Sequence, residues 1–232
     1  RSTLFPYTTL FRSGRRGTFD RWTAQKIGLG THPLTTDALK RWQWQRLQEV
    51  VQYAGEHSVF YRDKLKGVSF HNMETFSRNV PFTMPEELSA RGEEMICVPQ
   101  SRISRIVTLQ TGGSSGFPKR VYFTQEDQAL TSDFFAHGFP IFLGPEDCLM
   151  IFMPSQTPGS VGDLIRRGVS HIGATVIGPG LIDGSLTYDR AAQLIEEYHA
   201  TSIVGLPSQM QQLARTLPSP KHQIDSVLLS GD

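Results

Sequence analysis

The stretch Thr108-Leu-Gln-Thr-Gly-Gly-Ser-Ser-Gly-Phe-Pro-Lys-Arg120 lies between two β-rich runs, residues 103–109 and 120–124. Its residues 111–119 hold three glycines, three hydroxyl side chains and one lysine. Glycine adopts positive φ and lets the backbone approach a ligand closely. Successive backbone N–H groups in such a turn form a concavity that binds anions. The stretch therefore predicts a loop that holds a polyphosphate; the alternative is a flexible solvent loop that only joins two strands.

This loop differs from the common nucleotide-binding motifs. A Walker A loop has Gly-Lys-Ser/Thr leading into a helix. Here Phe117 and Pro118 separate Gly116 from Lys119, and a strand-like run follows. The pattern also does not match GxGxxG, so neither a P-loop nor a dinucleotide-binding fold is predicted.

Beyond the loop, short β-rich runs alternate with amphipathic helical patterns. The segments expected as strands are 103–109, 120–124, 148–153, 174–177, 202–206 and 226–229. The segments expected as helices are 125–139, 162–172 and 188–199, the last with Thr187 as its N-cap. Repeated strand–helix–strand connections favour a parallel sheet. The sequence thus predicts an α/β fold with a mostly parallel sheet flanked by helices.

Before residue 100 the pattern is helical. Apolar residues from Leu39 to Ala54 recur at steps near 3.6, which predicts a helix capped by Thr36 or Asp37 and ending near Gly55. The segment 81–88 resembles a loop that enters a short helix with Pro85 in its first turn.

The chain begins with a segment that does not look like part of a domain. Residues 1–13 repeat Thr-Leu-Phe and resemble a translated adapter more than a signal peptide. We therefore expect 1–17 to be a non-native or disordered leader. Residues 18–100 are expected to form an N-terminal helical segment, and 101–232 a second subdomain.

Composition excludes several classes of protein. The formal net charge is +1, from 23 basic and 22 acidic residues, which argues against nucleic acid as the main partner. The longest apolar runs of the sequence are far shorter than the roughly 20 residues of a membrane span. Cys97 and Cys148 lie far apart, so neither a disulfide framework nor a metal site is expected, and a cytoplasmic location is the default.

Thr-Gly-Gly-Ser-Ser-Gly-Phe-Pro-Lys resembles the signature loop of the adenylate-forming (AMP-binding) superfamily, which includes acyl-CoA synthetases, luciferases and peptide-synthetase adenylation domains. That loop usually reads Thr/Ser-Ser-Gly-Thr-Thr-Gly-x-Pro-Lys. The departures are Gly112, which replaces a serine, and Ser114 and Ser115, which replace two threonines but keep their hydroxyls. The resemblance implies that 101–232 is an ATP-binding α/β subdomain.

Further segments resemble phenylacetate–CoA ligases. They are residues 46–54 with Phe60-Tyr61, then 81–88, 123–127, 168–177 and 204–208, in the family's order. Val227-Leu-Leu-Ser-Gly-Asp232 is similar to the start of the family's Gly-Gly-Glu segment. The resemblance implies a partial N-terminal domain, truncated at its C-terminal end, with the catalytic residues expected beyond Asp232.

The resemblance implies an AMP-forming acid–thiol ligase that uses ATP and Mg²⁺ and takes coenzyme A as co-substrate. A carboxylate attacks the α-phosphate of ATP, and a thiol then attacks the acyl-adenylate. The fragment alone is expected to be inactive. The residues implied to bind the ATP phosphates are Thr111, Gly112, Gly113, Ser114, Ser115, Gly116 and Lys119.

Two further sets of residues are candidates. Ser155, Gln156 and Thr157 follow the expected strand 148–153, where ligands of open parallel sheets gather, and are candidates for the acyl pocket. The family's aromatic-Gly pair is absent there, which puts an aryl acid in doubt. Gly231 and Asp232 are candidates for the adenine side, and His171 is expected to be structural.

The partners expected are a small-molecule carboxylic acid, ATP and CoA. Two alternatives remain open at this point. One is an adenylation domain that loads a carrier-protein thiol, and the other is a non-catalytic module that binds a nucleotide or an acyl ligand.

Overall fold

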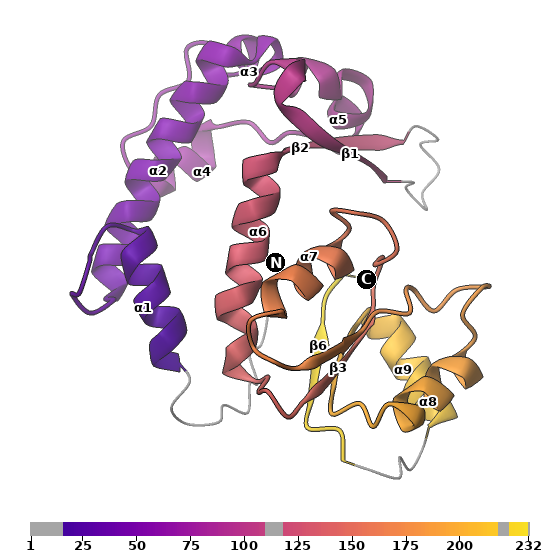
Figure 1. Ribbon diagram of the computed structural model, residues 1–232. Coiled ribbons are helices and arrows are strands. Elements are labelled where there is room, and N and C mark those ends of the chain that lie inside the picture. The colour runs from indigo at the N-terminus through magenta and orange to yellow at the C-terminus, as the bar shows by residue number, and fades with distance from the viewer. Residues whose placement is uncertain (1–15, 110–117, 218–222, 232) are drawn as a thin grey trace. The chain divides into compact units, whose positions relative to one another are not determined.

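The computed structural model describes residues 16–109, 118–217 and 223–231 (Figure 1). Two compact units are present. The sheet unit consists of residues up to 22 together with 129–232, and the hairpin unit consists of 23–128. The predicted division into a leader, a helical segment and an α/β subdomain, with boundaries at residues 17 and 100, remains a prediction.

The sheet unit contains a four-stranded parallel sheet in the order β4-β3-β5-β6. Its strands are β3 (Cys148–Phe152), β4 (Thr175–Ile177), β5 (Ser202–Gly205) and β6 (Ser226–Leu229). Its helices are α7 (Val161–Val169), α8 (Tyr188–Glu197) and α9 (Pro207–Thr216), with the short η3 (Phe139–Ile141). The predicted α/β fold with a mostly parallel sheet is confirmed.

Strand β3 is the centre of the sheet unit. It pairs with β4 on one side and β5 on the other, and all five of its residues are buried. Successive side chains of a strand point to opposite faces. Met150 and Phe152 accordingly pack with α8 and α9, whereas Leu149 and Ile151 pack with α7 and the segment 139–143. Figure 1 shows these helices around the sheet.

Close helix packing on the second face depends on Gly168 of α7. A Cβ atom at this residue would lie 2.6 Å from the carbonyl oxygen of Ser132 and 2.7 Å from Cβ of Phe135, both in α6 (Gln125–Gly138). The backbone of α7 can therefore approach α6 only with glycine at this position. The contact fixes α7, which starts next to the end of β3.

Helix ends follow local hydrogen-bonding chemistry. Thr187 caps α8 as predicted, since its hydroxyl accepts from the Arg190 N–H at 3.2 Å. The predicted helix 162–172 ends earlier, at Val169, and Gly173 adopts a φ of +87° shortly after it. His171 therefore lies in a turn rather than in a helix, and it is exposed.

The hairpin unit consists of helices and one antiparallel pair of strands, β1 (Ile103–Leu109) and β2 (Lys119–Thr124). Its helices are α2 (Thr36–His57), α3 (Val59–Lys64), α4 (Met73–Asn79) and α5 (Pro85–Arg91), with η1 (Gly92–Met95) and η2 (Gln100–Arg102). Helix α1 (Arg16–Lys26) spans the boundary at 22, and α6 spans the boundary at 128.

The caps predicted for the long helix, Thr36 or Asp37, are wrong by one and two residues. The side chain of Thr35, not Thr36 or Asp37, accepts from the Ala38 N–H, and α2 continues to His57. A helix N-cap has an extended backbone and a side chain that accepts from N2 or N3. Thr35 meets both conditions, with φ −118° and ψ 153°.

Phe60 is the buried side chain around which the hairpin unit packs its α3 and α5 helices. It is 1% exposed, and the cationic groups of Lys64 and Arg91 lie 5.0 and 4.9 Å from its ring centroid. The neighbouring Ser58 is also buried, and its hydroxyl donates to the Glu94 carbonyl at 2.7 Å. These contacts tie α3 to η1.

Candidate functional site

The phosphate-binding residues predicted from the sequence fall mostly outside the described residues. Thr111, Gly112, Gly113, Ser114, Ser115 and Gly116 are in this group. The flanking strands are described: β1 ends at Leu109, β2 begins at Lys119, and these two residues face each other in the antiparallel register. Lys119 is partly exposed. The candidate loop thus joins the two strands of a hairpin.

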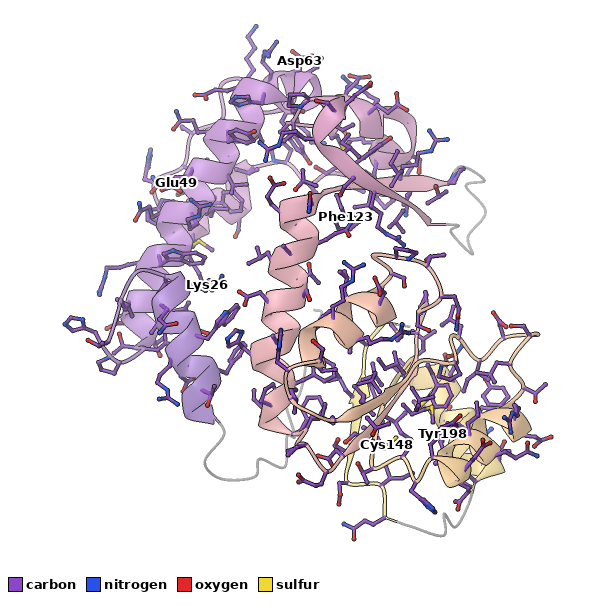
Figure 2. All side chains as sticks on the ribbon, viewed as in Figure 1. Lys26, Glu49, Asp63, Phe123, Cys148 and Tyr198 are labelled. Carbon is purple, nitrogen blue, oxygen red and sulfur yellow. The ribbon has the colours of Figure 1, made fainter. Side chains whose placement is uncertain are left out.

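The hairpin unit also contains an open cavity of about 590 Å³ beside β2. Tyr53, Met95, Ile96 and Phe123 contribute to its largely apolar lining, and Phe123 is labelled in Figure 2. Burial raises the pKa of the nearby Cys97 thiol above its usual range. We assign no reaction to this cavity.

The second candidate region is the carboxyl edge of the parallel sheet. Parallel strands end at the same edge, and ligands of open α/β sheets bind there. In this chain the residues that follow β3, β4 and β6 at that edge include Ser155, Gly178 and Gly231. Figure 2 labels Cys148, which begins β3 at the opposite edge.

The side chains of Ser155 and Gln156 both donate to the carbonyl of Gly178, the residue that follows β4. Ser155 is 4% exposed, and its hydroxyl donates to the Gly178 carbonyl at 2.8 Å. The Gln156 amide donates to the same carbonyl at 3.1 Å and is exposed. Thr157 is exposed, and its carbonyl accepts from the Ser160 N–H at 3.0 Å. Two of the three predicted residues therefore converge on one carbonyl.

The turn that carries Ser155 is held by glycine packing. The Gly162 N–H donates to the Pro154 carbonyl at 2.8 Å, and a Cβ at Gly162 would lie 2.6 Å from Cβ of Ser155. Any larger residue would push Ser155 away from the sheet edge. The first turn of α7 thereby sets the position of the Ser155 hydroxyl.

Arg166 of α7 belongs to the same cluster, although the sequence analysis did not select it. Its Nη2 lies 3.5 Å from the Ser155 carbonyl oxygen, and it would lie 3.0 Å from a Cβ at Gly178. Arg166 could have been predicted from the direction of helical side chains, which lean toward the N-terminus of their helix. The N-terminus of α7 adjoins the carboxyl edge of the sheet. Gly178 was also missed, and a side chain there would collide with both Ser155 and Arg166.

Asp163 stabilises the start of α7. Its carboxylate accepts from the Gly159 N–H at 2.7 Å and forms an ion pair with Arg167. Burial opposes ionisation of this carboxyl, but the hydrogen bonds from Gly159 and Arg167 outweigh it and lower its pKa below the usual value. Asp163 is therefore an anion at neutral pH whose charge is already paired.

At the other end of the edge, the residues after β6 lie beside the end of β5. The Ser230 N–H donates to the Gly205 carbonyl at 3.2 Å. Gly231 has a φ of +81°, and a Cβ there would lie 3.0 Å from the Leu206 side chain. Asp232, the other residue predicted for the adenine side, lies outside the described residues.

Within 16–109, 118–217 and 223–231, no three His, Cys, Asp or Glu side chains are grouped so that they could hold a metal ion. In the same part of the chain, no helix combines the length and the apolar character needed to cross a membrane.

Comparison with known proteins gives a match at the level of structure. No family model matches the sequence, and no curated protein matches it. Among solved structures, an open conformation of 2-hydroxyisobutyryl-CoA ligase in complex with 2-HIB-AMP and CoA superposes with a TM-score of 0.67 at 21% identity. The alignment covers 86% of this chain and 49% of that chain.

The same ligase in its thioesterification state gives a TM-score of 0.69 at 21% identity, over 86% of this chain and 44% of that one. Its postadenylation state with R3-HIB-AMP gives a TM-score of 0.66 at 22% identity, over 85% of this chain and 44% of that one. This chain thus spans less than half the length of the solved ligases it matches. Its structural neighbours are adenylate-forming acyl-CoA ligases, and the chain has the fold of the corresponding part of those enzymes.

Proposed function

We propose that this chain is the ATP-phosphate-binding part of a carboxylate–CoA ligase that forms an acyl-adenylate and then an acyl-CoA thioester. The observation that carries the proposal is the TM-score of 0.67 to 0.69 against a ligase whose structures contain an acyl-adenylate and CoA. The sequence adds a loop of glycines, hydroxyls and one lysine between β1 and β2. Phenylacetate–CoA ligases are the subfamily that the sequence resembles.

The loop 111–119 is proposed to hold the β- and γ-phosphates of ATP. The donor set fits a polyphosphate, because hydroxyls, glycine N–H groups and a lysine all donate to anionic oxygens. Lys119 begins β2, so an ordered strand fixes the base of its side chain. Mg²⁺ would share the phosphate charge when bound. Nucleotidyl transfer depends largely on such positioning and charge neutralisation.

The carboxyl edge of the sheet is proposed as the acyl pocket. Ser155 and Gln156 meet there on the Gly178 carbonyl, and Thr157 follows them. Gly231 and Asp232 are proposed for the adenine side. The groups that complete catalysis are proposed to belong to parts of the enzyme outside this chain, because the solved ligases are about twice as long. The proposed location is the cytoplasm.

The thiol acceptor is proposed to be CoA. An adenylation domain that loads a carrier protein is the second candidate, since both classes form an acyl-adenylate first. A binding module without chemistry is the third. Adding CoA or a carrier protein to the purified acyl-adenylate complex separates the first two, and pyrophosphate exchange separates both from the third.

The test is acid-dependent ATP–pyrophosphate exchange by the complete gene product that contains this chain. Exchange is expected with Mg²⁺ and a carboxylic acid. Gly116→Val should abolish most of it, because a β-branched side chain disfavours positive φ and blocks close backbone approach. Lys119→Ala should weaken it moderately, since the lysine contributes only charge.

Two matched substitutions serve as controls. Gly184 has no atom within 4 Å of an added Cβ, so Gly184→Val should leave exchange unchanged. Lys66 is exposed in the hairpin unit, so Lys66→Ala should do the same. Full exchange activity in Gly116→Val would contradict phosphate binding by the loop, and no exchange with any acid would contradict the ligase assignment.

A further inference from the structure

The carboxyl edge of the sheet holds a cation that the proposed function does not use. The guanidinium of Arg166 reaches back along α7 to this edge, where its Nη2 lies 3.5 Å from the Ser155 carbonyl. That distance is at the long limit of an N–H···O hydrogen bond, whose usual range is about 2.7–3.2 Å. A guanidinium has five N–H donors in a planar fork. One long contact leaves most of that donor capacity available.

The carboxylate nearest in sequence, Asp163, feels the charge of Arg166, which helps to lower its pKa, but it forms its ion pair with Arg167. Asp163 lies on the first turn of α7 and also accepts from the Gly159 N–H. Among the described residues, no carboxylate lies within ion-pair distance of Arg166. Arg166 is also exposed, so a ligand at the edge can reach its guanidinium.

The surrounding atoms hold the guanidinium at the edge. Gly178 allows this, because a side chain there would lie 3.0 Å from Nη2 and would displace it. The Gln156 amide donates to the Gly178 carbonyl beside it. That amide also donates to the Pro179 carbonyl at 3.5 Å, so its N–H groups are already used. The guanidinium of Arg166 therefore supplies the available N–H donors at the end of β4, and an oxygen-rich group with negative charge complements it.

We infer that Arg166 selects the carboxylic acid substrate, an inference that rests on the proposed acyl pocket. The substrate then carries a second anionic group, and a dicarboxylic acid is the simplest such compound. One carboxylate is activated by ATP, and the other accepts hydrogen bonds from the Arg166 fork. Carboxylate matches this fork in a bidentate manner. Arg166 is thus a specificity-determining residue that takes no part in bond formation.

The experiment measures kcat/KM for pyrophosphate exchange by the complete gene product with matched acids. Each pair has equal chain length, such as adipate with hexanoate and succinate with butyrate. The wild type is expected to prefer one dicarboxylate over its monocarboxylate. Arg166→Gln should lower kcat/KM for that dicarboxylate by about 10-fold to 100-fold, the range for a hydrogen bond to a charged group. It should leave the monocarboxylate within about twofold.

Two variants separate specificity from structure. Arg215→Gln removes an exposed arginine of α9, whose Nη1 donates to Gln212, and should change kcat/KM for neither acid. Arg166→Lys keeps the charge and should retain part of the preference. Thermal unfolding of each variant checks that the fold is intact.

The outcomes are distinct. A wild type that uses only monocarboxylates would overturn the inference and leave the ligase assignment standing. An equal loss for both acids in Arg166→Gln would also overturn it, since Arg166 would then only brace the Ser155 turn. No exchange with any acid would overturn the proposed function itself.

Discussion

The two compact units bury their apolar residues very differently. In the part of the chain that the structure describes, the hairpin unit contributes only Ala24, Ala38 and Phe60 to the buried apolar side chains. The sheet unit contributes the rest, including all of β3. Hydrophobic burial is the main favourable term in folding. The carboxyl edge therefore lies on a buried core within its own unit, whereas β1 and β2, the strands that flank the predicted phosphate loop, have no buried apolar side chain among their described residues.

The largest expected effect is in the centre of the sheet unit. Phe152 is fully buried on the face that packs against α8 and α9. Phe152→Ala should lower the free energy of unfolding by about 3–5 kcal/mol, through lost transfer energy and a cavity. Urea unfolding followed by circular dichroism measures it. Phe82 is 81% exposed, so Phe82→Ala is the control and should change stability by less than about 0.5 kcal/mol.

The matching change in the hairpin unit is Phe60→Ala. The free energy of unfolding should fall by about 3 kcal/mol, at the low end for phenylalanine, because exposed Arg91 and partly exposed Lys64 can relax into the space. Hydrogen exchange should become faster at the amides of residues 58–64 and 92–95 and should stay unchanged in β3. Faster exchange throughout β3 would mean that the two units unfold together, which would break the comparison.

Helix caps give a smaller and more local comparison. Thr187 caps α8 in the sheet unit, and Asn72 caps α4 in the hairpin unit by accepting from the Thr75 N–H at 2.8 Å. Each substitution by alanine should cost about 1 kcal/mol. Because α8 packs on β3, Thr187→Ala should lower the midpoint of the main transition. Asn72→Ala should increase only the local exchange of α4, and a shift of the main transition would contradict this.

The two cysteines give the smallest effect. Burial raises the pKa of both thiols, so each holds less thiolate at a given pH than a free cysteine. Alkylation should be slow at pH 7 and should accelerate as pH rises, because the thiolate is the nucleophile. Cys148 is 8% exposed and should react after Cys97, which is partly exposed. Mass spectrometry of a timed alkylation checks the order, and earlier reaction of Cys148 would show that β3 opens to solvent more readily than its burial predicts.

Much of the fold was predictable because local pattern and tertiary packing agree. All six strands were expected close to their observed bounds, since each is a short β-rich run between turn residues. Thr187 was identified because an N-cap needs only local hydrogen bonds. The early end of α7 was not predictable from periodicity, since the apolar pattern continues to Ile172 after the helix has ended.

The candidate site was predictable only in part. Ser155 and Gln156 were selected from their place after a strand, and both side chains donate to the Gly178 carbonyl. Their role in an acyl pocket, like that of Thr157, stays a prediction. Arg166 and Gly178 were not found, because their proximity arises from the pairing of β3 with β4 and is not encoded by spacing. The roles predicted for 111–116 and Asp232 stay predictions.

The parallel pairing of β3 has a consequence for the order in which the chain folds. Leu149 lies opposite Ser202, which is synthesised about 50 residues later. At the usual rate of synthesis, about 5–20 residues per second, the apolar segment Cys148–Phe152 waits several seconds for this neighbour. Pairings between distant residues also slow folding, because the intervening loop must close first. During that interval the apolar side chains of β3 are open to association with other nascent chains, and chaperone dependence should fall when β5 has emerged.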